Sequence, residues 1–239
     1  MPEEPVRRKV RVSENGPYLV EGAHLRRVRP VYDAEGAGVE WQWGPSIECA
    51  PCYELCRCGL SQTKPFCDGT ERDAGFDGTE VADRRPTAER RRTFGDNPMV
   101  LTDDRKLCAH MAFCESGGGN AWVLAAKAVE DPATSERLIQ MVRRCPSGRL
   151  QRHLTPGGEP VEEELDPVIG VVENGPYWVR GGIPVQGVDG FEYEVRNRIT
   201  LCRCGHSRNK PFCDGSHWKV GFSDPWSEDM APAPPEPSP

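Results

Sequence analysis

The sequence lacks a long apolar run and has little apolar material for its length. Hydrophobic residues make up 37 % of the 239 residues, which is low for one thick core and favours several small modules. No stretch of about 18 apolar residues is present to span a bilayer, and the first residues lack the apolar segment of a secretory signal. We therefore expect a soluble, intracellular protein located in the cytoplasm.

Basic residues are outnumbered by acidic ones, 30 to 37. The formal net charge is -7 at pH 7, which argues against general nucleic-acid binding. The arginine-rich stretch at 84–92 is typical of a solvated linker. The sequence also offers no nucleophile motif, phosphate-binding loop or acid–base pair. These gaps predict a carrier rather than an enzyme.

Cysteine, in contrast, is abundant. The chain has 11 cysteines, an odd number, and a reducing compartment keeps thiols free of disulfides. Ligation of a metal or cofactor is therefore the better prediction for these thiols. Glycine and proline are also frequent, with 25 and 23 residues, which favours short strands, tight turns and loops.

An internal repeat organises the chain. The pentapeptide ENGPY at 14–18 recurs at 173–177, and the 21 residues that begin at Cys56 match those that begin at Cys202 at 13 positions. Each pentapeptide predicts a turn that enters a strand. Alternating apolar residues also precede the second cysteine cluster, so its first ligands are expected where a strand runs into a loop.

The second cysteine cluster is the more complete of the two. Cys202 and Cys204 alternate on an extended chain, a loop containing glycine and proline returns the chain to Cys213, and a short helix is expected to begin near His217. Thiolates with one imidazole suit an iron–sulfur centre. The same soft ligands also suit tetrahedral zinc, and the spacing alone does not decide between zinc and an iron–sulfur centre.

The full string from Cys202 to His217, CRCGHSRNKPFCDGSH, resembles the CDGSH iron–sulfur family, also called mitoNEET-type. It meets the family pattern CxCxx[ST]xxxPxCDG[STA]H at every position. The resemblance implies a 2Fe-2S cluster with Cys202 and Cys204 on the buried iron and Cys213 and His217 on the outer iron. It also implies paired modules, which two copies in one chain would supply within a monomer. For electron transfer we expect a redox partner to dock near an exposed histidine edge.

The first cluster departs from this pattern at one ligand. Cys56, Cys58 and Cys67 are kept, but Glu71 stands where the second copy has His217. A carboxylate is a harder ligand that stays anionic at neutral pH, so we expect a second 2Fe-2S cluster with a different potential and a weaker hold. Its fourth ligand could be Glu71, water or a cysteine of a nearby insertion.

That insertion lies between the first pentapeptide and the first cysteine cluster. The pentapeptides are 159 residues apart and the clusters 146, so the first copy has 13 more residues here. We expect the insertion to include Cys49 and Cys52. Their CxxC spacing fits an inert pair, a reversible dithiol or part of a zinc site.

A third group of cysteines lies between the copies. Cys108, His110 and Cys114 are followed by Cys145, which stands directly before Pro146. A cysteine before proline is typical of the distal ligand in ferredoxins. Apolar residues at helical spacing (Leu138, Met141, Val142) predict a helix that begins at Thr134 or Ser135 and ends at Pro146.

This segment resembles the divergent single-cluster ferredoxins, which carry CxHxxxC followed by CPSGAL. The resemblance implies a 3Fe-4S cluster on Cys108, Cys114 and Cys145, or a 4Fe-4S cluster if His110 or another group supplies the fourth bond. Alternatively, His110 packs or hydrogen-bonds. Arg149 replaces the usual alanine, a departure that we expect to be minor.

The expected fold is α+β and β-dominated, with two small CDGSH β modules forming an internal pseudo-dimer and an inserted ferredoxin-like α/β unit. The expected division is an N-terminal module (1–78), a linker (79–97), a middle region (98–150), a second linker (151–167), a C-terminal module (168–226) and a disordered tail (227–239). His24, His153 and His206 are expected to be ordinary surface or loop residues.

Electron transfer is the leading predicted function. Cluster storage, cluster transfer or redox sensing is the second possibility, and a structural zinc protein is the third. The expected partner is a redox protein or an apo-protein that accepts a cluster, with no nucleic acid and no membrane span.

Overall fold

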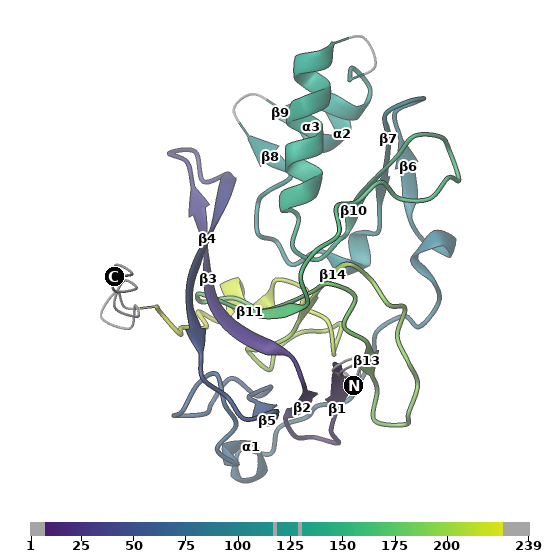
Figure 1. Ribbon diagram of the computed structural model, residues 1–239. Helices are drawn as coiled ribbons and strands as arrows, with labels where there is room; N and C mark the ends of the chain where they lie inside the picture. The colour runs from purple at the N-terminus through teal and green to yellow at the C-terminus, as the bar shows by residue number, and fades with distance from the viewer. Residues whose placement is uncertain (1–7, 117–118, 129–130, 227–239) are drawn as a thin grey trace, which may run out of the picture.

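Short strands form most of the regular structure, as the glycine and proline content predicts (Figure 1). The computed structural model describes residues 8–116, 119–128 and 131–226, and the predicted tail at 227–239 lies outside this part. Within it there are three sheets, one two-stranded ribbon and four α-helices. The prediction of a β-dominated fold is confirmed.

Two of the sheets lie in the lower part of Figure 1. The first has the order β13-β1-β2-β5, and its strands are β13 (Val185–Gln186), β1 (Lys9–Val12), β2 (Tyr18–Glu21) and β5 (Cys52–Leu55). The second has the order β14-β12-β11-β3-β4, and its strands are β14 (Arg198–Leu201), β12 (Tyr177–Arg180), β11 (Val168–Val172), β3 (His24–Tyr32) and β4 (Gly38–Ile47).

Each of these sheets contains a segment from the other module. The hairpin β3–β4 of the N-terminal module joins the second sheet, where β3 pairs in parallel with the whole of β11. In return, β13 of the C-terminal module pairs in parallel with β1. One apolar core contains buried residues of both modules, including Tyr18 and Tyr177. Because strands and core are shared, the two modules cannot separate without breaking both sheets.

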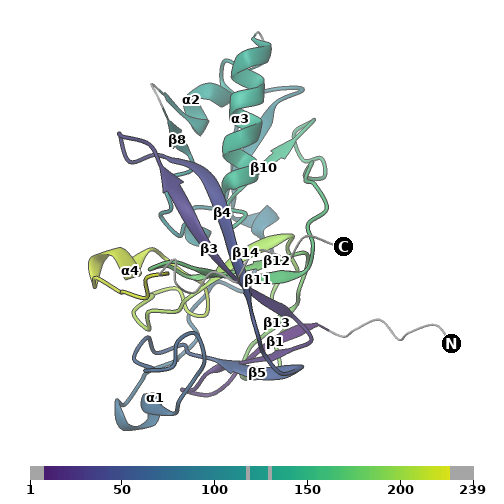
Figure 2. The ribbon, with the colours of Figure 1, turned by 60° about the vertical axis from the view of Figure 1, so that its left-hand side comes forward.

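The middle region forms the upper lobe (Figures 1 and 2). Its sheet has the order β10-β7-β6. The other elements are short except for α3, and the bounds are β6 (Arg92–Phe94), β7 (Val100–Asp103), β10 (Leu150–His153), β8 (Glu115–Ser116), β9 (Gly119–Asn120), α2 (Ala121–Ala125), α3 (Pro132–Arg144) and the 3₁₀ turns η1 (Thr87–Glu89) and η2 (Arg105–Leu107). The segment 79–97, predicted as a linker, thus contributes β6 to this sheet.

The predicted helix of the middle region is confirmed, but its start is not. Asp131, rather than Thr134 or Ser135, is the N-cap of α3, because its carboxylate accepts hydrogen bonds from the backbone amides of Ala133 and Thr134. The apolar positions Leu138, Met141 and Val142 are buried, and Cys145 is the C-cap residue before Pro146.

The extra residues of the N-terminal module form the long β3–β4 hairpin, which reaches the middle region. Trp41 on β4 donates from Nε1 to the carbonyl of Arg144 at the end of α3 (2.8 Å) and stacks on Phe113 with 4.6 Å between ring centres. The predicted placement of Cys52 in the insertion is wrong. Cys52 begins β5 opposite Glu21, the same pairing that Arg198 makes with Arg180 in the C-terminal module.

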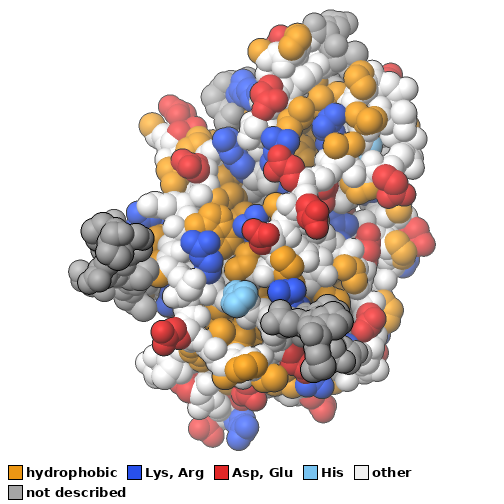
Figure 3. Space-filling model, in the orientation of Figure 1, with side chains coloured by type: hydrophobic (Ala, Val, Ile, Leu, Met, Phe, Trp, Pro, Cys, Tyr) orange, Lys and Arg blue, Asp and Glu red, His pale blue; other side chains and the backbone are white. Residues whose placement is uncertain are grey.

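Charged side chains of both signs are interspersed on the face shown in Figure 3. Within the arginine-rich stretch at 84–92, Arg84 pairs with Asp189 (2.6 Å) and Arg90 with Asp104 (2.7 Å). These arginines therefore tie the connection between the modules to its surroundings. None of the described helices combines the length and apolar character needed to cross a membrane.

Candidate metal centres

The first two cysteines of each module follow directly after a strand. β5 leads into Cys56 and Cys58, and β14 leads into Cys202 and Cys204. The loop then folds back, since the amide of Cys56 donates to the carbonyl of Pro65 and that of Cys202 to Pro211 (2.9 and 2.8 Å). The predicted position of these ligands at a strand-to-loop transition is confirmed.

Each CxC pair brings two sulfur atoms together. The Sγ atoms of Cys56 and Cys58 are 3.7 Å apart, and those of Cys202 and Cys204 are 3.9 Å apart. One tetrahedral ion at about 2.3 Å from each sulfur bridges a pair of this width. A hydrogen bond from the neighbouring thiol lowers the pKa of Cys56 to about 6 and that of Cys202 to about 7. One thiol in each pair is thus held near its metal-binding thiolate form.

A second pair of candidate ligands forms where each loop enters a short helix, α1 (Thr70–Asp73) or α4 (Ser216–Lys219). In the C-terminal module Sγ of Cys213 is 3.4 Å from Nδ1 of His217. In the N-terminal module the thiol of Cys67 donates to Oε2 of Glu71 at 3.1 Å. Figure 2 shows both helices on the same side of the two sheets.

Glycine permits the backbone turn between the ligands of this second pair. The residues before α1 and α4 are Gly69 and Gly215, with φ of 87° and 82°, a conformation that disfavours residues with a Cβ. The turn lets a helix begin three residues after the cysteine. As a result, the side chain four residues after each cysteine returns to its sulfur.

The imidazole of His217 is buried, with 2 % of its surface exposed. Burial lowers its pKa to about 4, with smaller contributions from Arg203 and His110, so the ring is neutral at neutral pH, as a metal ligand must be. Its Nε2 atom is buried and has no hydrogen-bond partner among the described residues. The expected exposed histidine edge is therefore wrong, because this ring is buried beside Trp218, with 5.3 Å between ring centres.

Glu71 is also buried, with 5 % of its surface exposed, whereas its partner Cys67 is only half-buried. Burial, together with a smaller contribution from the hydrogen bond to Glu71, raises the pKa of Cys67 to about 11. The structure thus places Glu71 beside Cys67, while Cys52 is exposed on β5 and Cys49 packs against the core.

The arginine inside each CxC is buried but is held differently in the two modules. Arg203 donates to the carbonyls of Gly175 (2.8 Å) and Val172 (2.6 Å) and forms an ion pair with Asp224. Arg57 donates to the carbonyl of Gly78 (2.8 Å), and its Nε and Nη1 atoms have no partner among the described residues. Among the described residues, the Arg57 side chain is therefore less completely hydrogen-bonded than that of Arg203.

The tyrosines of the two ENGPY segments reach across to the opposite module. The hydroxyl of Tyr18 lies 2.9 and 3.0 Å from the carbonyls of Cys202 and Pro211. The hydroxyl of Tyr177 lies 2.9 Å from the carbonyls of both Cys56 and Pro65. Each ligand loop is thus braced by the other module.

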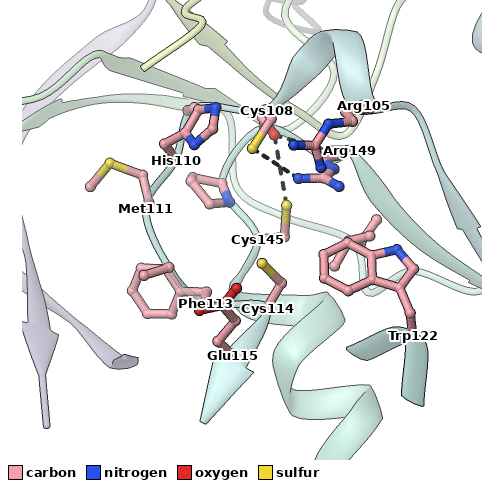
Figure 4. A pocket seen from close by; sticks show the side chains of 15 residues that line it. Arg105, Cys108, His110, Met111, Phe113, Cys114, Glu115, Trp122, Cys145 and Arg149 are labelled. Atoms are coloured by element: carbon pink, nitrogen blue, oxygen red, sulfur yellow. Dashed lines mark hydrogen bonds between the residues drawn. The ribbon is translucent and has the colours of Figure 1, made fainter. Parts of the chain in front are cut away.

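The three cysteines of the middle region line one cavity of about 270 Å³ (Figure 4). Cys108 follows the 3₁₀ turn η2, Cys114 precedes β8, and Cys145 caps the end of α3. In Figure 4 their sulfur atoms face a common space. Burial raises the pKa of Cys114 to about 12.

His110 lines the rim of the same cavity and also contacts the C-terminal module. Its backbone has φ of 55°, and a Cβ built on Gly215 would be 2.6 Å from its Cδ2 atom. Its carbonyl accepts a hydrogen bond from Nε1 of Trp218 (3.1 Å). A role of His110 as a cluster ligand stays a prediction, and its packing against the C-terminal loop is a finding.

Arg149 is a residue of this site that the sequence did not reveal. Its side chain lines the cavity, and Nη1 donates to Sγ of Cys108 at 2.9 Å. The only signal in the sequence is the arginine at a position where the family has alanine. We expected this replacement to be minor, because the contact of Arg149 with Cys108 depends on the fold and not on neighbouring residues.

The candidate ligands of the N- and C-terminal modules form two pairs in each module, the CxC pair and the pair at the start of the short helix. Within the described ranges, no three His, Cys, Asp or Glu side chains are arranged to hold one metal ion.

Comparison with known families agrees with these sites. The family described as "iron-binding zinc finger CDGSH type" matches residues 15–70 and 174–218, and "divergent 4Fe-4S mono-cluster" matches residues 94–154. The chain contains two CDGSH modules around a divergent ferredoxin-type region. No curated protein and no solved structure matches the chain. Both CDGSH matches span the cysteines of the paired sites, and the third match spans Cys108, Cys114 and Cys145.

Proposed function

We propose that the protein is an electron carrier with three iron–sulfur centres and no enzymatic reaction of its own. Such a centre supplies reversible one-electron chemistry. The observation that carries the proposal is the direct packing of the middle cysteine site against the C-terminal CDGSH site. A protein that only displayed structural metal sites would not need them adjacent.

The ligand pairs support a 2Fe-2S centre in each CDGSH module. Cys202 and Cys204 would hold one iron of the C-terminal centre, and Cys213 with Nδ1 of His217 the other. In the N-terminal module the corresponding pairs are Cys56 with Cys58 and Cys67 with Glu71, which are close in the same way. Cys108, Cys114 and Cys145 would hold a 3Fe-4S or 4Fe-4S centre.

The contact between the middle and C-terminal sites is largely apolar. Ala109, Met111 and Phe113 share one buried cluster with Cys213, and the side-chain amide of Asn209 donates to the carbonyl of Lys106 (2.7 Å). Close packing between the ligand loops fixes the separation of the two sites.

The reciprocal contacts of the CDGSH modules support an internal pseudo-dimer. Tyr18 and Tyr177 make equivalent hydrogen bonds in opposite directions, and their rings meet edge to face with 6.0 Å between centres. β3 and β13 are likewise each placed in the sheet of the other module. We therefore expect a monomer in which both halves of the pair belong to one chain.

Electron paramagnetic resonance of the dithionite-reduced full chain tests this function. The variants Cys58→Ser and Cys204→Ser assign the two 2Fe-2S signals, and Cys145→Ser removes the middle centre. We expect the C-terminal signal to relax faster in the wild type than in Cys145→Ser, because a nearby paramagnet accelerates relaxation. The N-terminal signal is the internal control and should change less.

Equal relaxation of the C-terminal signal with and without the middle centre would contradict the proposal. So would colourless protein with zinc in place of iron, or loss of iron during one cycle of reduction and reoxidation. Reversible reduction of all centres without iron loss is the expected result.

One observation favours cluster transfer as a second function. The N-terminal site pairs a half-buried cysteine with a carboxylate, and its Arg57 is incompletely hydrogen-bonded. If the protein delivers a cluster to an apo-protein, the N-terminal centre is expected to leave first. Mixing with an apo-ferredoxin and following its visible spectrum would show transfer, and Cys58→Ser should abolish it while Cys204→Ser should not.

A further inference from the structure

Arg149 is a buried cation at the middle cysteine site. Only 5 % of the residue is exposed. Its Nε and Nη2 atoms donate to the two carboxylate oxygens of Asp103, the second at 2.8 Å. Such a two-point pair fixes the plane of the guanidinium and leaves one nitrogen, Nη1, pointing away from the carboxylate.

Trp122 holds the same pair from the other side. Its indole Nε1 donates to Oδ2 of Asp103 (3.0 Å), and the guanidinium carbon of Arg149 lies 5.0 Å from its ring centre. The arginine is thus fixed by an ion pair and a ring contact.

The remaining nitrogen of Arg149 is aimed at a predicted ligand. Nη1 donates to Sγ of Cys108 at 2.9 Å, as the dashed line in Figure 4 shows. Arg105 also lines the cavity, but it is exposed and makes no hydrogen bond to a cysteine sulfur among the described residues. The contact with the ligand sulfur is therefore specific to Arg149.

We propose that Arg149 is a positioning residue that sets the reduction potential of the middle centre by donating to Cys108 Sγ, with Asp103 as the opposing charge. The inference rests on the proposed function, since it requires a centre at Cys108, Cys114 and Cys145. Reduction adds one electron to the centre and hence one negative charge. A fixed cation at hydrogen-bond distance in a buried site stabilises that charge and raises the potential.

The step needs no proton transfer. In the test below, dithionite gives one electron to the oxidised centre, and no bond to Arg149 forms or breaks. The guanidinium stays protonated in both states. The Asp103 carboxylate partly offsets its charge, so the two residues should act on the potential in opposite directions.

A redox titration of the purified full chain, followed by electron paramagnetic resonance with dithionite as reductant, tests the proposal. For Arg149→Gln we expect the oxidised-to-reduced ratio at a fixed solution potential to rise about tenfold, which for a one-electron couple is a drop of about 59 mV. Asp103→Asn should shift the potential upward. Arg149→Lys keeps the positive charge but loses the planar guanidinium that pairs with Asp103 at two points. The reduction potential of this variant should therefore lie between those of the wild type and Arg149→Gln.

Arg105→Gln is the matched control. It removes a positive charge from the same cavity without removing a bond to sulfur, so its shift should be much smaller than that of Arg149→Gln. A merely structural role of Arg149 predicts loss of iron or shifts of the same sign for both single variants. Unchanged potentials in variants that retain iron, or equal shifts for the two arginine variants, would overturn the proposal.

Removing either buried charge alone leaves the other unpaired and endangers folding. The double variant Asp103→Asn with Arg149→Gln removes both charges. Its potential should lie below wild type, because the guanidinium and not the carboxylate contacts the sulfur, and an unchanged or higher potential would overturn the proposal. Absence of any iron–sulfur signal from the middle region of the wild type would instead contradict the proposed function.

Discussion

In the C-terminal CDGSH module a buried Cys213 faces the imidazole of His217, whereas in the N-terminal module a half-buried Cys67 faces the carboxylate of Glu71. The CxC pairs, by contrast, have similar sulfur separations in both modules, 3.7 and 3.9 Å. The duplicated scaffold therefore keeps the inner half of the site and varies the outer half.

The surroundings of the outer half differ as well. Segment 109–113 of the middle region packs on the C-terminal site, where Ala109 and Met111 lie in the same buried cluster as Cys213. In the N-terminal module, Gly69 and Gly75 beside the corresponding loop have open space at the position of a Cβ. The C-terminal ligand pair therefore packs against the middle region, whereas the loop beside the N-terminal pair is open at these two glycines. Three predictions test this difference, from the largest expected effect to the smallest.

Asp224→Gly should cause the largest loss of stability. Asp224 pairs with two buried arginines, Arg203 and Arg27, and the N-terminal module has Gly78 at the equivalent position. Removing the carboxylate leaves both cations uncompensated, which should lower the free energy of unfolding by about 3 kcal/mol. Urea unfolding followed by circular dichroism measures the change.

Asp77→Gly is the control, because Asp77 is exposed and stands next to Gly78 in the N-terminal module. Its effect should be well below that of Asp224→Gly. Equal effects of the two substitutions would show that the ion-pair network does not distinguish the modules.

Exchanging the fourth ligands should change the lifetime of the clusters. Glu71→His gives the N-terminal site the softer ligand, and His217→Glu gives the C-terminal site the harder one. We expect the rate of iron release to a chelator to fall about tenfold at the first site and to rise about tenfold at the second, at the lower end of the range for altered metal surroundings. The absorbance of the two centres, assigned with Cys58→Ser and Cys204→Ser, gives both rates.

If neither exchange alters release, Glu71 and His217 do not bind iron. If Glu71→His alone has no effect, another group is the fourth ligand of the N-terminal site. Substitutions of Cys49 and Cys52 then test whether one of these cysteines is that ligand.

The smallest expected effects come from the crossed tyrosines. Tyr18→Phe and Tyr177→Phe each remove one buried hydroxyl that bonds to two carbonyls, at a cost of about 1 kcal/mol each. Because each hydroxyl braces the opposite module, Tyr18→Phe should speed iron release from the C-terminal centre and Tyr177→Phe from the N-terminal centre. Effects confined to the module that carries the substitution would contradict the internal pseudo-dimer.

Local patterns predicted the parts of the structure that depend on neighbouring residues. Each pentapeptide leads into a strand, as predicted, and its tyrosine is the first residue of β2 or β12. The spacing from Cys202 to His217 brings the ligands of each pair together, and the helical spacing of Leu138, Met141 and Val142 marks α3.

Features that depend on distant segments were not predictable from these patterns. His110 of the middle region packs against Gly215, two residues before His217, although the two segments are far apart in the chain. His153 was expected at the surface, but it is fully buried on β10, where it bonds to Oγ1 of Thr102 (2.9 Å) and the carbonyl of Gly158 (2.7 Å). His24 and His206 are exposed, as predicted.

The exchange of β3 and β13 has the same origin, because local alternation identifies a strand but not its partner. Arg149 shows the limit for a site residue. Its contact with Cys108 joins positions 41 residues apart. The arginine in place of the family's alanine therefore did not predict this contact, which depends on how the chain folds.

The most direct test of the account is electron–nuclear double resonance spectroscopy of the dithionite-reduced protein labelled with ¹⁵N in its histidines. The account predicts two 2Fe-2S signals, one coupled to a directly bound histidine nitrogen and one without such coupling, and predicts that His217→Cys removes the coupling. Histidine nitrogen bound at both centres or at neither, or protein that contains zinc and no paramagnetic centre, would contradict it.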